Sequence, residues 1–235
     1  MSAPIHTAMV MAAGHGTRMR PLTDDRPKAL VEVGGRALID HMLDRLRDAG
    51  VRRAVVNVHA FADRLESHLK SRTDVDIIIS DERAELLETG GGVVKALPLL
   101  GEEPVFIANI DAIWVEWEPV LSQMLECWDP SRMDELFLLA DREHCLGYGG
   151  SGDFEMGPDG LRRRTDATAP LVYAGVEIFK PELARGLATE RFSRNRIWDT
   201  TLPRGRVAGM ALPGYWMHVG DPQARDAAET VLAGL

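Results

Sequence analysis

The sequence lacks several features that would place it outside ordinary intracellular globular proteins. Cysteine is scarce: Cys127 and Cys145 are the two in 235 residues, and their spacing matches neither a zinc site nor a redox motif. No apolar run is long enough to span a bilayer. The first residues also lack the charged start and long apolar core of a secretory signal. These absences predict a cytoplasmic protein with reduced thiols.

Positive charge is also in deficit, and this limits the expected partners. The 27 Lys and Arg residues are outnumbered by 36 Asp and Glu residues, which gives a formal net charge of −9. An acidic chain is not typical of proteins that bind nucleic acid or anionic membranes broadly. Any positive charge that handles an anionic ligand must therefore be placed locally.

Short apolar runs alternate with amphipathic stretches in the first half of the chain. Strands are expected over residues 7–13, 53–58, 75–80 and 104–110, and helices over 37–50, 61–70 and from 91 to 100. Strand–helix–strand units at this spacing predict a parallel, right-handed, doubly wound sheet. We expect an α/β fold of Rossmann-like, three-layer α/β/α type, with a mixed, mostly parallel central sheet.

The pattern loosens after residue 111. Helices are expected over 117–128, in "PELARGLA" and in the last 15 residues, strands over 135–140, 171–179 and within 206–220, and a glycine-rich hairpin or loop over 146–160. No Pro- or Ser-rich linker separates the halves. This predicts a single domain over 1–235, with one half at about 1–112 and a smaller lobe at about 113–235.

The segment "MAAGHGTRMRPLTDDRPKAL" indicates an anion site. Gly14 and Gly16 follow a buried strand, so their backbone N–H groups can wrap a phosphate, and Arg18 and Lys28 lie close behind. A dinucleotide fingerprint needs a third small residue where Met19 stands, and the G-x-x-x-x-G-K-[ST] phosphate loop is absent. The segment therefore favours a phosphate-transfer site of another kind.

This segment resembles the signature of the nucleoside-triphosphate:sugar-1-phosphate nucleotidyltransferases, G-x-G-T-R-x-x-P-L-T followed by P-K. "LLETGGGVVKALPLL", "NIDAIW" and "WMHVG" follow in the order of that family. The runs "ETGGG", "GSGDF" and "FSRNRIWDTTL" most resemble the bacterial N-acetylmuramate-1-phosphate uridylyltransferases of peptidoglycan recycling. The resemblance covers nearly the whole chain.

The resemblance implies a reaction in which a sugar-1-phosphate oxygen attacks the α-phosphorus of a nucleoside triphosphate in line and pyrophosphate leaves. Arg18 and Lys28 are then the implied catalytic cations. The implied nucleotide-binding residues lie mainly in the first glycine loop: Ala12, Ala13, Gly14, Gly16, Thr17 and Gly91. The implied sugar contacts are Asn109, Gly152, Gly175 and Trp198. The first half of the domain would bind the nucleotide and the second half the sugar.

The resemblance also implies Mg²⁺ at Asp111, with Mn²⁺ as an alternative. The family often has a second metal-binding aspartate in a late W-x-D-x-G motif, where this chain has His218, a poor magnesium ligand. Asp221 is a second candidate ligand, although it also suits a helix N-cap. The family's acidic-acidic-Lys-Pro segment is missing, and the basic run 162–164 in that region is expected to be a solvated face.

Several alternatives stay open from the sequence. The substrates could instead be a hexose-, mannose- or heptose-1-phosphate with dTTP, UTP or GTP. A catalytically silent relative that binds nucleotide sugars and regulates a partner is opposed by the intact Arg18, Lys28 and Asp111, but His218 keeps this alternative open. A nicotinamide-dependent oxidoreductase is opposed by Met19. The expected partners are a nucleoside triphosphate and a sugar-1-phosphate, with no nucleic acid or membrane, for a monomer or homodimer.

Overall fold

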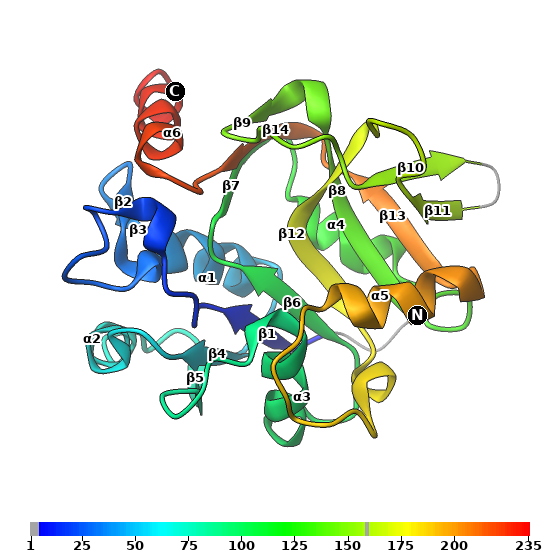
Figure 1. Cartoon of the computed structure of the whole chain (residues 1–235), viewed down its shortest axis with the longest axis horizontal. Helices are drawn as coiled ribbons and strands as arrows, with labels where there is room; N and C mark the ends of the chain where they lie inside the picture. The colour runs from blue at the N-terminus through cyan, green and yellow to red at the C-terminus, as the bar shows by residue number, and fades with distance from the viewer. Residues whose placement is uncertain (1–4, 158–159) are drawn as a thin grey trace.

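The computed structural model describes residues 5–157 and 160–235, and a mixed β-sheet lies at its centre (Figure 1). Its strands among these residues are β1 (Thr7–Met11), β4 (Arg53–Val58), β5 (Asp76–Asp81), β6 (Val105–Asn109), β8 (Glu135–Asp141), β10 (Phe154–Gly157), β11 (Gly160–Arg163), β12 (Leu171–Phe179) and β13 (Val207–Ala211). The order is β11-β10-β12-β6-β1-β4-β5, and β8 pairs with both β12 and β13.

The two halves of the sheet differ in strand direction. In the first half, β1 pairs in parallel with β4 and β6, and β4 pairs in parallel with β5. In the second half, β12 runs antiparallel to β6 and β8. The expected mixed, doubly wound fold is confirmed. Because β1 and β6 are parallel neighbours, the residues that follow them emerge at the same edge of the sheet.

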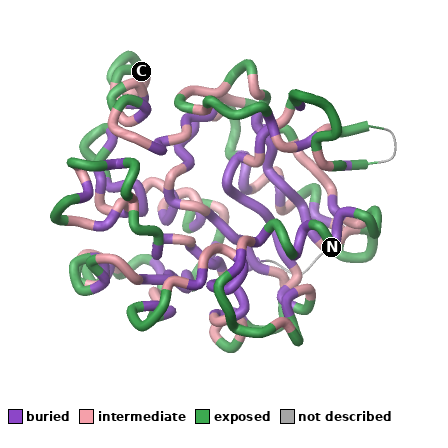
Figure 2. The backbone as a smooth tube through the Cα atoms, in the orientation of Figure 1, coloured by how far each residue is buried: buried purple, intermediate pink, exposed green. Residues whose placement is uncertain are grey.

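Helices cover both faces of the sheet, as the alternation along β1 requires. Ala8 and Val10 pack into the larger core cluster with residues of α1, and Met9 packs into a second cluster with Val93 of α3. Figure 2 shows the buried strands between these layers. The helices are α1 (Leu38–Asp48), α2 (Ala62–Leu69), α3 (Glu88–Leu100), α4 (Val120–Cys127), α5 (Asn195–Thr201) and α6 (Pro222–Ala233).

Two smaller sheets complete the structure, and one of them reaches the edge where β6 ends. β2 (Glu32–Val33) pairs with β3 (Arg36–Ala37). β14 (Gly214–His218) pairs antiparallel with β7 (Ala112–Glu116) and in parallel with β9 (Cys145–Leu146). His218 lies opposite Ala112 in this pairing. The pairing therefore places His218 beside the short segment that joins β6 to β7.

Most elements lie where the sequence predicts them, and strands 53–58 and 171–179 are confirmed at both ends. The helix expected in "PELARGLA" is wrong, because only a 3₁₀ turn forms at Pro181–Ala184. Arg185 is extended and Gly186 has a φ of 80°, which ends the turn. β10 and β11 form a hairpin that begins within the glycine-rich segment expected over 146–160 but extends beyond it to Arg163; residues 158–159 lie outside the described part. The division into two halves stays a prediction.

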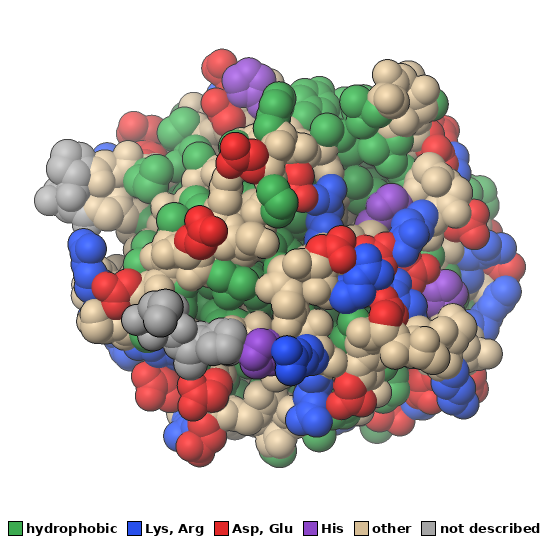
Figure 3. Space-filling view, turned by 180° about the vertical axis from the view of Figure 1, so that it is seen from behind, with side chains coloured by type: hydrophobic (Ala, Val, Ile, Leu, Met, Phe, Trp, Pro, Cys, Tyr) green, Lys and Arg blue, Asp and Glu red, His purple; other side chains and the backbone are tan. Residues whose placement is uncertain are grey.

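Basic and acidic side chains gather together on the right-hand side of the face that Figure 3 shows. Arg72, largely buried, bonds Asp40 and Asp44 of α1 and also Asp74, which precedes β5. Networks of this kind stabilise more than isolated surface pairs.

Among the described residues, no helix combines the length and the apolar character that a membrane span needs.

A buried acidic pair lies between β8 and β12. Glu135 and Glu177 are both fully buried, and Arg194, itself 3% exposed, faces them as the nearest cation. Burial raises the pKa of both carboxyls above 4.5, and the charge of Glu177 raises the pKa of Glu135 further. One guanidinium cannot neutralise two buried carboxylates, so the folded protein retains a proton on this pair.

This pair should make stability fall as pH rises. A carboxyl whose pKa is higher in the folded than in the unfolded protein favours the folded state at low pH. This contribution to stability is complete below the unfolded pKa and is lost as pH rises through the folded pKa. We expect the free energy of unfolding in urea to fall by about 1–3 kcal/mol between about pH 6 and about pH 9. Glu135→Gln should flatten that slope, whereas the surface change Glu118→Gln should leave it intact. An unchanged slope in Glu135→Gln would contradict the assignment.

Candidate active site

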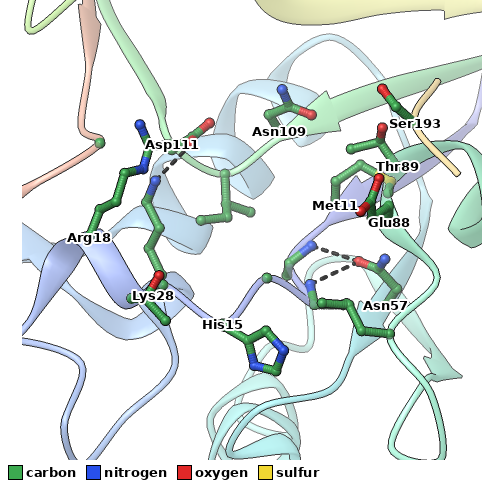
Figure 4. A pocket seen from close by; sticks show the side chains of 18 residues that line it. Met11, His15, Arg18, Lys28, Asn57, Glu88, Thr89, Asn109, Asp111 and Ser193 are labelled. Carbon is green, nitrogen blue, oxygen red and sulfur yellow. Dashed lines mark hydrogen bonds and ion pairs between the residues drawn. The ribbon is translucent and has the colours of Figure 1, made fainter. Parts of the chain in front are cut away.

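A buried hydrogen-bond chain fixes the loop that follows β1. The Asn57 side-chain oxygen accepts from the backbone N–H of Ala12 at 2.6 Å and of Ala13 at 3.2 Å (Figure 4). The Asn57 amide donates to Glu82 at 2.8 Å, and the other oxygen of Glu82 accepts from Leu87 N–H at 3.0 Å. The chain thus ties the ends of β1, β4 and β5 to the entrance of α3.

This chain accounts for two polar residues that the sequence analysis missed. Asn57 and Glu82 are 2% and 0% exposed, and burial of such groups is costly unless they are hydrogen-bonded. A Cβ on Gly92 would lie 2.8 Å from the Glu82 carboxylate, so the glycine at this position leaves room for the chain. The asparagine within the apolar run "RAVVNV" was the available signal.

Gly16 brings Lys28 beside the glycine loop. Its φ is +63°, a left-handed conformation that favours glycine. A Cβ there would lie 3.0 Å from the Lys28 Cβ. Its carbonyl accepts from the Thr23 hydroxyl at 2.8 Å, which closes the excursion between the loop and Lys28. Lys28 and the glycine loop therefore line the same cavity.

Lys28 meets Asp111 at the end of β6. The lysine Nζ lies 2.8 Å from Asp111 Oδ2, and His218 Nε2 lies 3.4 Å from the same oxygen. Burial alone would raise the pKa of Asp111, but the Lys28 charge and the His218 contact outweigh it, so the pKa lies well below its usual range. Asp111 is therefore an anion at neutral pH.

Two cavities meet at this ion pair. The first, about 490 Å³, lies between the glycine loop and the entrance of α3. The second, about 300 Å³, lies among β12, β14, α5 and the hairpin. Asn109 and Asp111 line both cavities. A ligand in one cavity therefore adjoins a ligand in the other at the end of β6, as a reaction between two substrates requires.

Most predicted site residues line one of these cavities. Those on the first cavity are Ala12, Ala13, Gly14, Gly16, Thr17, Arg18, Lys28, Asn109 and Asp111. Those on the second, besides Asn109 and Asp111, are Gly175, Trp198 and His218. Among the described residues, Gly91, Gly152 and Asp221 belong to neither lining. Their roles in ligand binding stay predictions.

Gly91 and Gly152 have structural roles of their own. A Cβ on Gly91 would lie 2.0 Å from the carbonyl oxygen of Glu190. Gly152 has a φ of +84°, and a Cβ on it would lie 2.1 Å from the Ala169 carbonyl oxygen. Both positions therefore require glycine because the neighbouring backbone approaches so closely.

Asp221 caps the last helix. Its Oδ1 accepts from Ala224 N–H at 2.8 Å, and Pro222 follows at the first helical position. Within residues 5–157 and 160–235, no three His, Cys, Asp or Glu side chains converge as a metal-binding group. Of the three predicted metal ligands, Asp111 and His218 are the two whose side chains the structure brings close together, 3.4 Å apart.

Further residues on the cavities were not predicted from the sequence. Glu88, Thr89 and Ser193 line the first cavity, and the first two of these open the "ETGGG" motif, which was the available signal. Tyr148, Asp153, Tyr173 and Arg163 line the second. Arg163 corrects the expectation that 162–164 is only a solvated face.

Comparison with known proteins supports this arrangement. Residues 8–193 match the family of MobA-like NTP transferase domains. The chain is 55% identical over 240 aligned residues to N-acetylmuramate alpha-1-phosphate uridylyltransferase of Caulobacter vibrioides, with 99% of each chain covered. It is 35% identical over 218 residues to the protein of that name from Neisseria meningitidis, with 91% of this chain and 92% of the relative covered. The chain belongs to the sugar-1-phosphate nucleotidyltransferase family.

Solved structures show the same fold for this nucleotidyltransferase. An inositol-1-phosphate CTP transferase from T. maritima superposes with a TM-score of 0.79 at 16% identity, covering 100% of this chain and 99% of the other. A UDP-glucose pyrophosphorylase complexed with UDP-glucose superposes with a TM-score of 0.77 at 17% identity, covering 98% and 99%. The predicted family and fold class are therefore confirmed.

Two glycine substitutions should separate ligand binding from packing in this nucleotidyltransferase. A Cβ on Gly14 would meet nothing within 4 Å, so Gly14→Ala should change the free energy of unfolding by less than about 0.5 kcal/mol. It should still weaken nucleoside triphosphate binding, measured by calorimetry. Gly91→Ala should cost about 1–3 kcal/mol in urea unfolding because the Glu190 backbone must move. Equal destabilisation by both changes would refute this division.

Proposed function

We propose that this protein joins uridine triphosphate to N-acetylmuramate α-1-phosphate, forming UDP-N-acetylmuramate and releasing pyrophosphate, as a step of peptidoglycan recycling. The observation that carries the proposal is the 55% identity, over 99% of both chains, to a protein of that name. The two cavities, which share Asn109 and Asp111 in their linings, support it because two substrates must react where they meet. The nucleotide would occupy the first cavity and the sugar the second.

The proposed reaction forms one bond and breaks one. An oxygen of the sugar phosphate attacks the α-phosphorus of the triphosphate, and the bond between the α- and β-phosphates breaks, so that the electron pair leaves with pyrophosphate. Little covalent help is needed, because positioning and neutralisation of charge supply most of the acceleration. We assign Lys28 to the developing charge at the α-phosphate and Arg18 to the departing pyrophosphate. The backbone at Gly14, Gly16 and Thr17 would cradle the triphosphate.

The donor set fits a magnesium ion shared with the substrate. Mg²⁺ is commonly held by one or two carboxylates together with substrate phosphates and water. The low pKa of Asp111 keeps it anionic, and it stands at the junction of the cavities. A bound Mg²⁺ would neutralise phosphate charge. His218 would support Asp111 through its contact with the same oxygen or, with Mn²⁺, bind the metal itself.

The proposal has alternatives in the substrate pair and in the class of protein. Other sugar 1-phosphates with dTTP, UTP or GTP are the alternative substrates, and a regulatory relative without turnover is the alternative class. The intact Lys28–Asp111 contact opposes the latter. A cytoplasmic location and a monomeric or homodimeric state stay predictions from the sequence.

A substrate grid tests the proposed function directly. Pyrophosphate release is measured with Mg²⁺ for four nucleoside triphosphates against N-acetylmuramate-, N-acetylglucosamine-, glucose- and mannose-1-phosphate. We expect release to be confined to UTP with the muramate ester. Release with another pair alone would refute the proposed substrates. Silence over the whole grid, from protein that binds nucleotide by calorimetry, would favour the regulatory relative.

Lys28 should contribute to kcat through its positive charge. We expect Lys28→Ala to lower kcat by about 10²- to 10³-fold, as loss of a single charge-stabilising donor does in other enzymes. Arg20→Ala is the matched control, since Arg20 is an exposed cation of the same segment that pairs with Asp24. It should keep kcat within about threefold. Comparable losses in both variants would show that the general charge of the segment, rather than Lys28, is responsible.

A further inference from the structure

The second cavity has one strongly basic side chain in its lining. Among the described residues that line it, Arg163 is the one Lys or Arg, and the acidic members are Asp111 and Asp153. Tyr173, Trp198 and Trp216 form aromatic walls. The Asp153 carboxylate accepts a hydrogen bond from the backbone N–H of Tyr173 at 3.0 Å. The cavity therefore offers an anion one fixed cation.

The Arg163 guanidinium is held in place from two sides. Its central carbon lies 5.3 Å from the ring centres of both Phe154 and Trp198, within the range of cation–π attraction. One nitrogen, Nη2, donates to Asn195 Oδ1 at 3.1 Å and to Asp199 Oδ1 at 2.8 Å. These contacts tie β11 to α5. A side chain restrained in this way loses little freedom when it binds a ligand.

Arg163 and Asp111 reach the second cavity from different parts of the main sheet. β11 and β6 are separated by β10 and β12 in the sheet, which corresponds to about 14 Å between the two strands at ~4.8 Å per step. Asp111 follows β6, yet it lines the same cavity as Arg163. One ligand can therefore place its phosphate at Asp111 and a substituent of its sugar ring near Arg163.

We propose that Arg163 recognises a carboxylate carried by the sugar ring and so selects acidic sugar 1-phosphates over neutral ones. The inference rests on the proposed function, because the muramate substrate carries a lactyl carboxylate that N-acetylglucosamine lacks. A planar guanidinium matches a carboxylate with two parallel hydrogen bonds. The hydrogen bonds of Arg163 to the Asn195 and Asp199 side chains both leave from Nη2, whereas the guanidinium has five N–H donors in all. Asp199 is 64% exposed, so solvent weakens its competition for the cation.

The test compares two substrates in four proteins. The kcat/KM is measured at saturating UTP for N-acetylmuramate- and N-acetylglucosamine-1-phosphate, and calorimetry measures binding of the two UDP-sugars where turnover of the neutral sugar is too slow. The proteins are the wild type, Arg163→Met, Arg163→Lys and Arg162→Met. Arg162 is the matched control, because it pairs with Glu155 on the hairpin and is not in the cavity lining.

Arg163→Met should lower kcat/KM by about 10- to 100-fold for the muramate ester and by less than about threefold for the neutral sugar, as expected for loss of a charge-assisted hydrogen bond. Arg163→Lys should lie between, and Arg162→Met should match the wild type with both. An equal loss with both sugars would assign Arg163 a structural role and overturn the proposal, as would no loss. If Arg163→Met fails to fold, the lactyl carboxamide analogue with the wild type must show the same loss.

Failure of the proposed function would look different. Wild-type protein that turns over no muramate ester refutes the proposed substrates, and the assignment of Arg163 falls with them. Wild-type protein that turns over the muramate ester, with a preference over the neutral sugar that does not depend on Arg163, refutes the assignment alone.

Discussion

The site depends on one buried amide. Asn57 lies at the carboxyl end of β4 and uses both ends of its side chain, accepting from the loop after β1 and donating to Glu82 beyond β5. A buried amide left without these partners would cost free energy, so the strand ends and the loop adopt their positions together. The first cavity is thereby shaped by contacts within the protein itself. Preorganisation of this kind is what a reaction driven by positioning and charge needs.

The arrangement of the sheet explains why two cavities share a wall. β1 and β6 are parallel, so the glycine loop and Asn109 emerge at one edge. β12 runs antiparallel to β6 and contributes Val172, Tyr173 and Gly175 to the second cavity. β6 therefore borders the parallel half on one side and the antiparallel half on the other. Asp111, which follows it, belongs to both cavities because of this position.

Much of the fold and part of the site could be predicted from the sequence. The short apolar runs located β4 and β12 to the residue, and the segment from Gly14 to Lys28 supplied residues that line the first cavity. The acceptor for the Asn57 amide could not be predicted, because Glu82 lies 25 residues along the chain, just after β5. Arg163 reads as a surface charge for a similar reason: the ring that holds it, Trp198, lies in another element. Contacts across elements leave no local periodicity.

The shared wall at Asp111 has an energetic consequence. Because the carboxylate is in contact with Lys28 and with His218 at once, a ligand that changes its position or charge from one cavity alters the potential in the other. Such coupling is reciprocal by thermodynamic necessity: whatever factor the first ligand applies to the affinity of the second, the second applies to the first. The affinities of the two substrates are therefore not independent quantities, and each is defined only when the occupancy of the other cavity is stated.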